Sequence, residues 1–183
     1  MDPIKKISIK AHFFLGLIVA TIVCLGVVVI GALGVEATWP AFFIMISFFI
    51  TGADVKNLPN IFIGAITGLI LSFVLLIAAA PAMAALGPTL GLLILVWLVV
   101  FLIVFGKEFL PQAFNDFAFI YFTIALIFAA EAATMTPAAI VSEYVTWALT
   151  AVLGGGGILA GIIGCITLAR KAGLLPPAAA SGH

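Results

Sequence analysis

Two acidic residues occupy the positions from which this chain could do chemistry. Asp54 and Glu131 each follow an apolar segment of 14 residues, Pro40–Ala53 and Phe117–Ala130, and the two acids lie 77 positions apart. An ionised carboxylate at membrane depth is costly, so such residues usually bind a proton or cation or line the path of a solute. We take both as candidate pathway or solute-binding residues. The alternative is that each only ends a helix among the lipid headgroups.

Aromatic and hydroxyl side chains accompany these acids. The further candidates for the same pathway are Phe48, Phe49 and Thr51 in the first segment and Tyr121 and Thr123 in the second. Adjacent phenylalanines on a short helix can form a constriction that closes a pore by excluding water. Phenylalanines more often face lipid or other helices, and hydroxyls more often bond back to their own helix. The pattern therefore predicts a barrier, with ordinary packing as the alternative.

Three other aromatic residues lie near the predicted outer ends of their segments, namely Trp39, Tyr144 and Trp147. Tryptophan and tyrosine are enriched at the boundary between membrane and water, where an amphipathic ring suits both surroundings. We expect these three residues in such an aromatic belt.

Other kinds of chemistry have little support in this sequence. It has no nucleophile elbow, no phosphate-binding loop and no spacing of metal ligands. Cys24 and Cys165 support neither a disulfide framework nor a zinc site. Seven basic residues balance seven acidic ones, which removes the electrostatic case for a nucleic-acid partner. We therefore expect no enzymatic activity, no cofactor and no metal.

The elements that must position these residues follow from the composition. Of 183 residues, 66% are hydrophobic and 8% are charged, with a mean hydropathy of +1.43. Soluble domains average about 25% charged residues, and one of this length could not hide so much apolar surface. The sequence predicts an all-α integral membrane protein whose partner is the lipid bilayer.

Six apolar segments are separated by short polar stretches, and each predicts a transmembrane helix. The segments are Phe13–Gly34, Pro40–Ala53, Ile61–Ala80, Leu86–Phe105, Phe117–Ala130 and Tyr144–Leu168. With a cytoplasmic N-terminus, six crossings place all seven basic residues inside, as the positive-inside rule predicts. We expect a multi-pass protein of the bacterial inner (plasma) membrane, with residues 1–12 and the tail 169–183 cytoplasmic and the transmembrane domain at 13–168.

The segments follow the order long, short, long in each half of the domain, residues 13–85 and 86–168. A bilayer core of about 30 Å needs about 20 helical residues, which the two 14-residue segments lack. Three helices per half would insert the second half upside down, giving the 3+3 inverted repeat of many transporters and channels. The alternative is a plain bundle with two tilted helices in a thinned bilayer.

Glycine pairs with three residues between them recur in the last segment of each half. Gly64 and Gly68 form one pair, and Gly157 and Gly161 form the other. Such spacing lets two helix backbones approach closely, so we expect all four glycines at helix–helix contacts. The same faces could join the chain to a homo-oligomer or to a larger membrane complex.

One stretch resembles a known family. The run Thr38-Trp39-Pro40-Ala41-Phe42, followed by Ser47-Phe48-Phe49 and Gly52, is similar to the domain of unknown function 1097 family of small multi-pass bacterial inner-membrane proteins. The resemblance covers about the first four segments. It implies a membrane location and brings no substrate with it.

Two expectations for function follow. The first is an oligomeric channel or facilitator for a small solute, with its pathway near the two short segments. The second is a non-catalytic structural or assembly subunit of a larger membrane complex. The sequence has no ATP-binding motif, so active transport would need an ion gradient and a coupling group, Asp54 or Glu131.

Overall fold

The computed structural model describes residues 3–132 and 136–176, and within these ranges it contains helices and no strand. The helices are α1 (Pro3–Ala32), α2 (Trp39–Ile50), α3 (Leu58–Leu86), α4 (Pro88–Gly106), α5 (Asp116–Ala132), α6 (Pro137–Leu149) and α7 (Gly156–Lys171). A 3₁₀ turn, η1 (Val55–Asn57), joins α2 to α3, and a π-helical segment, η2 (Thr150–Gly155), joins α6 to α7. The all-helical expectation is confirmed for the described residues.

Four helical stretches of the described chain are long and apolar enough to cross a membrane: Ala11–Ala32, Val55–Leu86, Pro88–Gly106 and Pro137–Lys171. The last stretch is α6, η2 and α7 in one continuous rod, which we call the α6–α7 rod. Helices α2 and α5 are shorter, with 12 and 17 residues. At 1.5 Å per residue they are about 18 Å and about 26 Å long, below the bilayer core of about 30 Å.

Two helix boundaries differ from the sequence expectation. Helix α3 continues through Pro81 to Leu86 and ends at Gly87, whose φ of 86° is a left-handed conformation that favours glycine. Proline removes one helical hydrogen bond, yet here it does not end the helix. The final rod begins at Pro137, before Tyr144, because the Thr136 side chain accepts a hydrogen bond from the Ala139 amide and caps the new helix.

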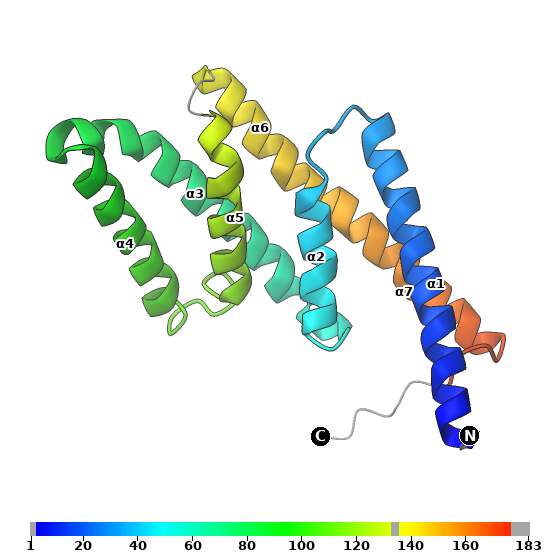
Figure 1. Cartoon of the computed structure of the whole chain (residues 1–183). Helices are drawn as coiled ribbons and strands as arrows, with labels where there is room; N and C mark the ends of the chain where they lie inside the picture. The colour runs from blue at the N-terminus through cyan, green and yellow to red at the C-terminus, as the bar shows by residue number, and fades with distance from the viewer. Residues whose placement is uncertain (1–2, 133–135, 177–183) are drawn as a thin grey trace.

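The helices lie side by side as a broad array (Figure 1). Helices α1 and α4 stand at the two sides, α2 and α5 stand between them, and the two long rods pass obliquely behind. Helix α3 packs on α4 and α5, while the α6–α7 rod packs on α1 and α2. Successive helices run in opposite directions, with α6 and α7 counted as one rod, so α1 begins at the end of the molecule where α7 finishes.

The main core lies where α2, α3, α5 and α6 meet. Its buried residues include Ile44, Phe48, Leu69, Tyr121 and Trp147. The outer helices contribute little to it, since Ile30 is the only buried residue of the α1 span Ala11–Ala32 and α4 buries only Gly91, Ile103 and Gly106. The apolar faces that α1 and α4 turn outward therefore need lipid or other protein to cover them.

In the run of four glycines at residues 154–157, the first two let the α6–α7 rod approach α2. A Cβ at Gly155 would lie 2.7 Å from Ile44 Cβ, and one at Gly154 would lie 3.3 Å from Ala41 Cβ. The rod takes its π-helical turn at this contact. The glycine run thus serves close packing of the two elements.

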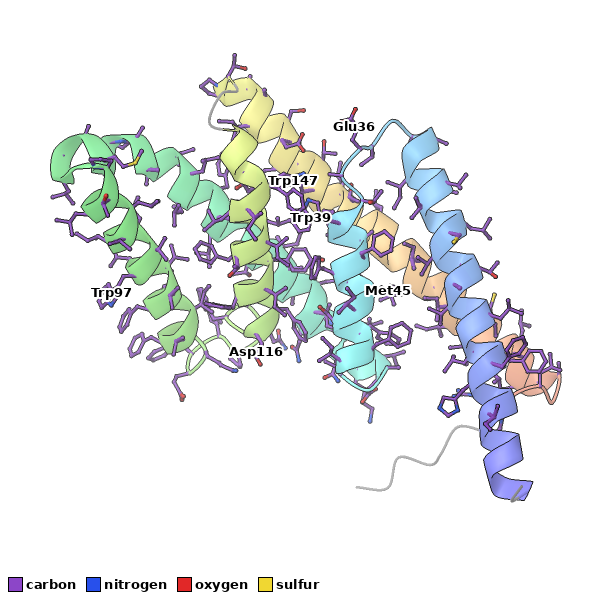
Figure 2. All side chains as sticks on the ribbon, in the orientation of Figure 1. Glu36, Trp39, Met45, Trp97, Asp116 and Trp147 are labelled. Carbon is purple, nitrogen blue, oxygen red and sulfur yellow. The ribbon has the colours of Figure 1, made fainter. Side chains whose placement is uncertain are left out.

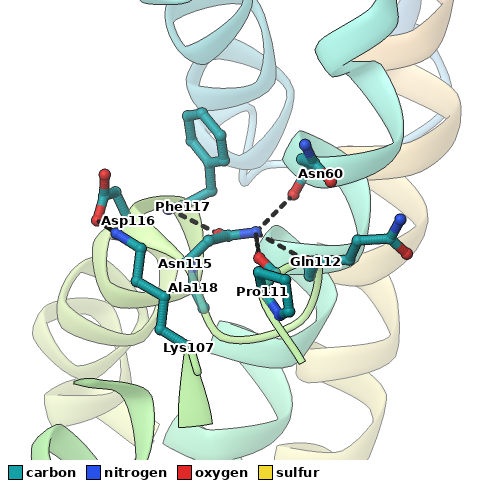
Figure 3. A network of polar contacts seen from close by, with 8 residues as sticks. All are labelled: Asn60, Lys107, Pro111, Gln112, Asn115, Asp116, Phe117 and Ala118. Atoms are coloured by element: carbon teal, nitrogen blue, oxygen red, sulfur yellow. Dashed lines mark hydrogen bonds and ion pairs between the residues drawn. The ribbon is translucent and has the colours of Figure 1, made fainter. Parts of the chain in front are cut away.

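A buried asparagine holds the start of α5 against α3 (Figure 3). The Asn115 amide nitrogen donates to the carbonyl oxygens of Asn60, Pro111 and Gln112 at 3.1, 3.3 and 2.8 Å. Its side-chain oxygen accepts from the amides of Phe117 and Ala118, at 3.0 and 3.1 Å. Asn115 therefore caps α5 and ties it to the first turn of α3.

Candidate functional site

Aromatic rings from three helices meet at the centre of the array. We call them the central aromatic cluster: Trp39 and Phe43 of α2, Tyr121 and Phe128 of α5, and Tyr144 and Trp147 of α6. Trp39 is the hub, because its ring stacks on Phe128 at 5.3 Å and meets Trp147 edge to face at 5.3 Å. Figure 2 shows the two tryptophans together between α2 and the rod behind it.

Hydrogen bonds fix the two tyrosines of this cluster. The Tyr121 hydroxyl, completely buried, donates to the carbonyl oxygen of Pro40 in the first turn of α2. The hydroxyls of Tyr144 and Ser72 share a hydrogen bond of 3.2 Å, which joins α6 to α3. Each tyrosine thus links two helices, and the short helices α2 and α5 touch directly.

The two indole nitrogens of the cluster lack such partners. Trp39 Nε1 and Trp147 Nε1 are both buried, and neither has a hydrogen-bond partner within the described residues. A buried donor left without an acceptor costs about 1–3 kcal/mol. Almost all buried polar groups in proteins are paired, so two unpaired donors on touching rings need an explanation.

The expectation of an aromatic belt is wrong for Tyr144 and Trp147. Their side chains are only 7% and 3% exposed, and Trp39 is half-buried against them. Their rings face inward because α6 packs against α2 and α3 on that side. Their positions near segment ends could not reveal which way they point.

The predicted pathway residues fall into two groups. Tyr121 and Phe48 are buried in the main core, whereas Phe49 is 36% exposed beside Phe48. The hydroxyls of Thr51 and Thr123 bond back to carbonyls of their own helices, Thr51 to those of Ser47 and Phe48 and Thr123 to that of Phe119. The structure thus places Tyr121 and Phe48 in the same core and leaves the threonines as helix-bonded side chains.

The structure describes the side chain of only one of the two candidate acids, Asp54. Asp54 is exposed, and its carboxylate accepts a hydrogen bond from the backbone amide of Lys56 at 2.9 Å, which caps the η1 turn. The carboxylate is therefore the N-cap of the turn that follows α2. The side chain of Glu131 lies outside the described residues. A part for either acid in a pathway stays a prediction.

Three of the four predicted glycine contacts are present. A Cβ at Gly64 would overlap the Asn115 side chain, one at Gly68 would overlap the carbonyl oxygen of Ala118, and one at Gly161 would lie 3.0 Å from Ile22. The expectation is wrong for Gly157, where an added Cβ would have no neighbour within 4 Å. One turn of helix separates Gly157 from Gly161, but the oblique crossing of α1 and α7 places only Gly161 against Ile22.

Apolar cavities flank the cluster. One of about 220 Å³ lies between α3 and α6, lined by Ile66, Leu69, Ile70, Phe73, Val141, Tyr144, Val145 and Ala148. A second, of about 510 Å³, continues along the same two helices past Phe73 and Val141. Tyr144 thus lines the first cavity, and its ring lies 4.8 Å from that of Trp147.

A third cavity, of about 420 Å³, lies where α1, α7 and the end of α2 converge, with His12 and Arg170 in its wall. Among the described residues, no group of three or more histidine, cysteine or acidic side chains could hold a metal ion. The walls of the first two cavities are formed mainly by apolar and aromatic side chains.

The comparisons with known proteins do not identify the chain. No family model, no curated protein and no solved structure matches it. The resemblance to the domain of unknown function 1097 family stays a prediction from the sequence.

Proposed function

We propose that this protein is a membrane facilitator for a small solute, with a pathway through the central aromatic cluster between α2 and α5. The observation that carries the proposal is the direct contact of two short helices at the centre of the array, through Trp39, Phe128 and Tyr121. Helices of about 18 and 26 Å leave part of a bilayer core uncovered beyond their ends. Lipid cannot satisfy exposed backbone there, so protein or water must. Water-filled entrances would then meet at the aromatic barrier.

The arrangement also supports an inverted repeat. Helices α1, α2 and α3 run in alternating directions, and α4, α5 and the α6–α7 rod repeat the order with every direction reversed. Each long rod packs on the outer and the short helix of the other half, α3 on α4 and α5, the α6–α7 rod on α1 and α2. An exchange of this kind is what a two-fold axis in the membrane plane produces. In this proposal all six helical rods are transmembrane or membrane-embedded.

The distribution of basic residues supports the proposed orientation in the membrane. The loop around η1, the connection between α4 and α5, and both ends of the described chain lie at one end of the molecule. These segments contain the basic residues Lys56, Lys107, Arg170 and Lys171, while Glu36 lies at the opposite end (Figure 2). We assign the basic end to the cytoplasm of a bacterium and the membrane to its inner membrane.

The test is solute flux into liposomes that contain the purified protein, measured by light scattering after rapid mixing with small uncharged solutes. Protein-containing liposomes should swell faster than empty ones. Phe128→Ala should raise the flux because it removes the barrier ring that stacks on Trp39, while Trp97→Ala, on the outer face of α4, should not. Liposomes that swell no faster with protein than without it would contradict the proposal.

A second candidate function has an observation of its own. Helix α4 exposes a row of stacked aromatic rings at four-residue intervals, Trp97, Phe101 and Phe105. Phe109, just beyond the end of the helix, extends the row with a tilted ring. Figure 2 shows Trp97 on the side of α4 that faces away from the other helices. An apolar row of this kind favours association, either with further copies of the chain or as an assembly subunit. Native mass measurement after mild extraction separates the cases: a homo-oligomer fits the facilitator, and larger partners in fixed ratio fit the subunit.

A further inference from the structure

The unpaired tryptophan donors are the feature that the fold alone leaves unexplained. Trp39 Nε1 and Trp147 Nε1 are buried without an acceptor in the described chain, although the neighbouring hydroxyls of Tyr121 and Tyr144 are both hydrogen-bonded. An indole N–H can donate and cannot accept. A molecule that pairs with these two N–H groups must therefore present a hydrogen-bond acceptor.

The surroundings restrict the charge of such an acceptor. Among the described residues the buried polar side chains are Ser47, Ser72, Asn115 and Thr150, and none is charged. A cation would face two donors and no acceptor of its own. An anion would enter an apolar site with no cationic side chain to offset its lost hydration. Glu36 lies three positions before Trp39 and Glu143 four positions before Trp147, and negative charge on these acids further disfavours an anion.

One cavity reaches a ring of the central aromatic cluster. Tyr144 is among the residues that line the cavity of about 220 Å³ between α3 and α6, and its ring lies 4.8 Å from that of Trp147. Tyr144 is itself buried, bonded to Ser72 and packed on Phe73 at a ring distance of 5.2 Å.

We propose that Trp39 and Trp147 form a binding site for a small uncharged carbonyl compound, whose oxygen accepts the two indole N–H groups. The inference rests on the proposed function and specifies its substrate class. The flat rings of the central aromatic cluster hold the apolar part of the solute, and the two donors select its oxygen. Tyr144 lines the cavity between α3 and α6 and also packs on Trp147.

The direct test uses acetamide and acetate, which have nearly the same shape and differ in charge. In the Trp97→Phe protein, labelled with ¹⁵N at the indole nitrogen and held in detergent micelles, Trp39 and Trp147 give the two tryptophan signals. Acetamide should shift both signals, and acetate at the same concentration should not. The protein with Trp39→Phe and Trp147→Phe keeps only Trp97, whose signal should respond to neither compound.

Solute flux provides a second test of the proposed site. Trp39→Phe and Trp147→Phe each remove one N–H and keep an aromatic ring, so each should lower acetamide flux in liposomes about three- to tenfold. Trp97→Phe should leave it unchanged. Because the ¹⁵N measurement uses the unaltered tryptophans, it remains decisive even if a phenylalanine variant fails to fold.

The outcomes separate the two proposals. Acetamide flux that is unaffected by either phenylalanine variant, with unmoved indole signals, would overturn the binding site and leave the facilitator standing. Indole signals that respond to acetamide in a protein without any solute flux would support the site and refute the facilitator. An equal response to acetate would overturn the selectivity for an uncharged oxygen.

Discussion

Replacing Gly68 with alanine tests the contact that joins the two halves of the molecule, because α3 packs on α5 at this residue. A Cβ added at Gly68 would overlap the carbonyl oxygen of Ala118, and it would lie 2.7 Å from Tyr121 Cβ and 2.8 Å from the Phe122 amide nitrogen. Two of these three atoms are backbone, so no side-chain rotation can make room. The helices must separate.

The size of the effect follows from two opposing terms. Overpacking an interior costs about 1–3 kcal/mol, and a clash with backbone falls at the upper end of that range. Alanine favours a helix over glycine by about 1 kcal/mol. The net loss should be about 2 kcal/mol in the free energy of unfolding. For a chain of this length each kcal/mol lowers the melting temperature by about 2–4 °C, so we expect a fall of about 4–8 °C.

Gly157→Ala is the matched control. This variant also replaces a helical glycine with alanine, but in α7, at a position where an added Cβ meets nothing within 4 Å. This variant should be as stable as the wild type or gain up to about 1 kcal/mol.

Both variants are measured in one detergent by thermal unfolding, with tryptophan fluorescence as the signal and size exclusion as a check on the folded state. The reasoning would be refuted if the melting temperature of Gly68→Ala equalled that of the wild type or exceeded that of Gly157→Ala.

Three further predictions concern other contacts, and a fourth concerns orientation. Gly161→Ile should weaken the packing of α7 on α1, since Ile22 Cγ2 lies 3.0 Å from the added Cβ; an unchanged melting temperature and oligomer size would contradict it. Asn115→Ala should cost about 2–4 kcal/mol, because it removes the cap of α5 and strands the backbone groups that Asn115 pairs; denaturant titration measures this loss. Asp54→Asn keeps the acceptor for the Lys56 amide, so stability should be unchanged, while a role in the pathway predicts altered solute flux in liposomes. A single cysteine at position 107, in a cysteine-free background, should resist membrane-impermeant reagents added to intact cells; ready labelling would reverse the proposed orientation.

Part of the candidate site could be found in the sequence. The two short segments and their aromatic residues, Phe48 and Tyr121 among them, stand out because segment length and residue type are local properties. The Asn115 cap was missed, although an asparagine directly before an apolar helix is a known signal for a helix start. Its bond to the carbonyl of Asn60, 55 residues earlier, has no local signature.

Other assignments failed because they depend on the direction of a side chain. Trp147 and Tyr144 stand near a segment end, as residues of a membrane belt do, yet both are buried. Gly157 and Gly161 share one motif, yet only Gly161 meets a neighbouring helix. In each case the crossing angle of two helices, which the spacing of one segment cannot supply, decides which face is covered.

The sequence by itself determined that this chain is helical and apolar enough for a membrane, and it marked α2 and α5 as too short to cross a core of about 30 Å. These properties depend on hydropathy summed along a continuous run, and no distant residue alters the sum. Only the tertiary structure decided that Trp39, Tyr121 and Trp147 meet, and that two of them hold indole donors without acceptors. Those residues are brought together from α2, α5 and α6 by the oblique packing of α3 and the α6–α7 rod. A meeting of three helices is a matter of geometry between elements, and it exists only once all of them are packed.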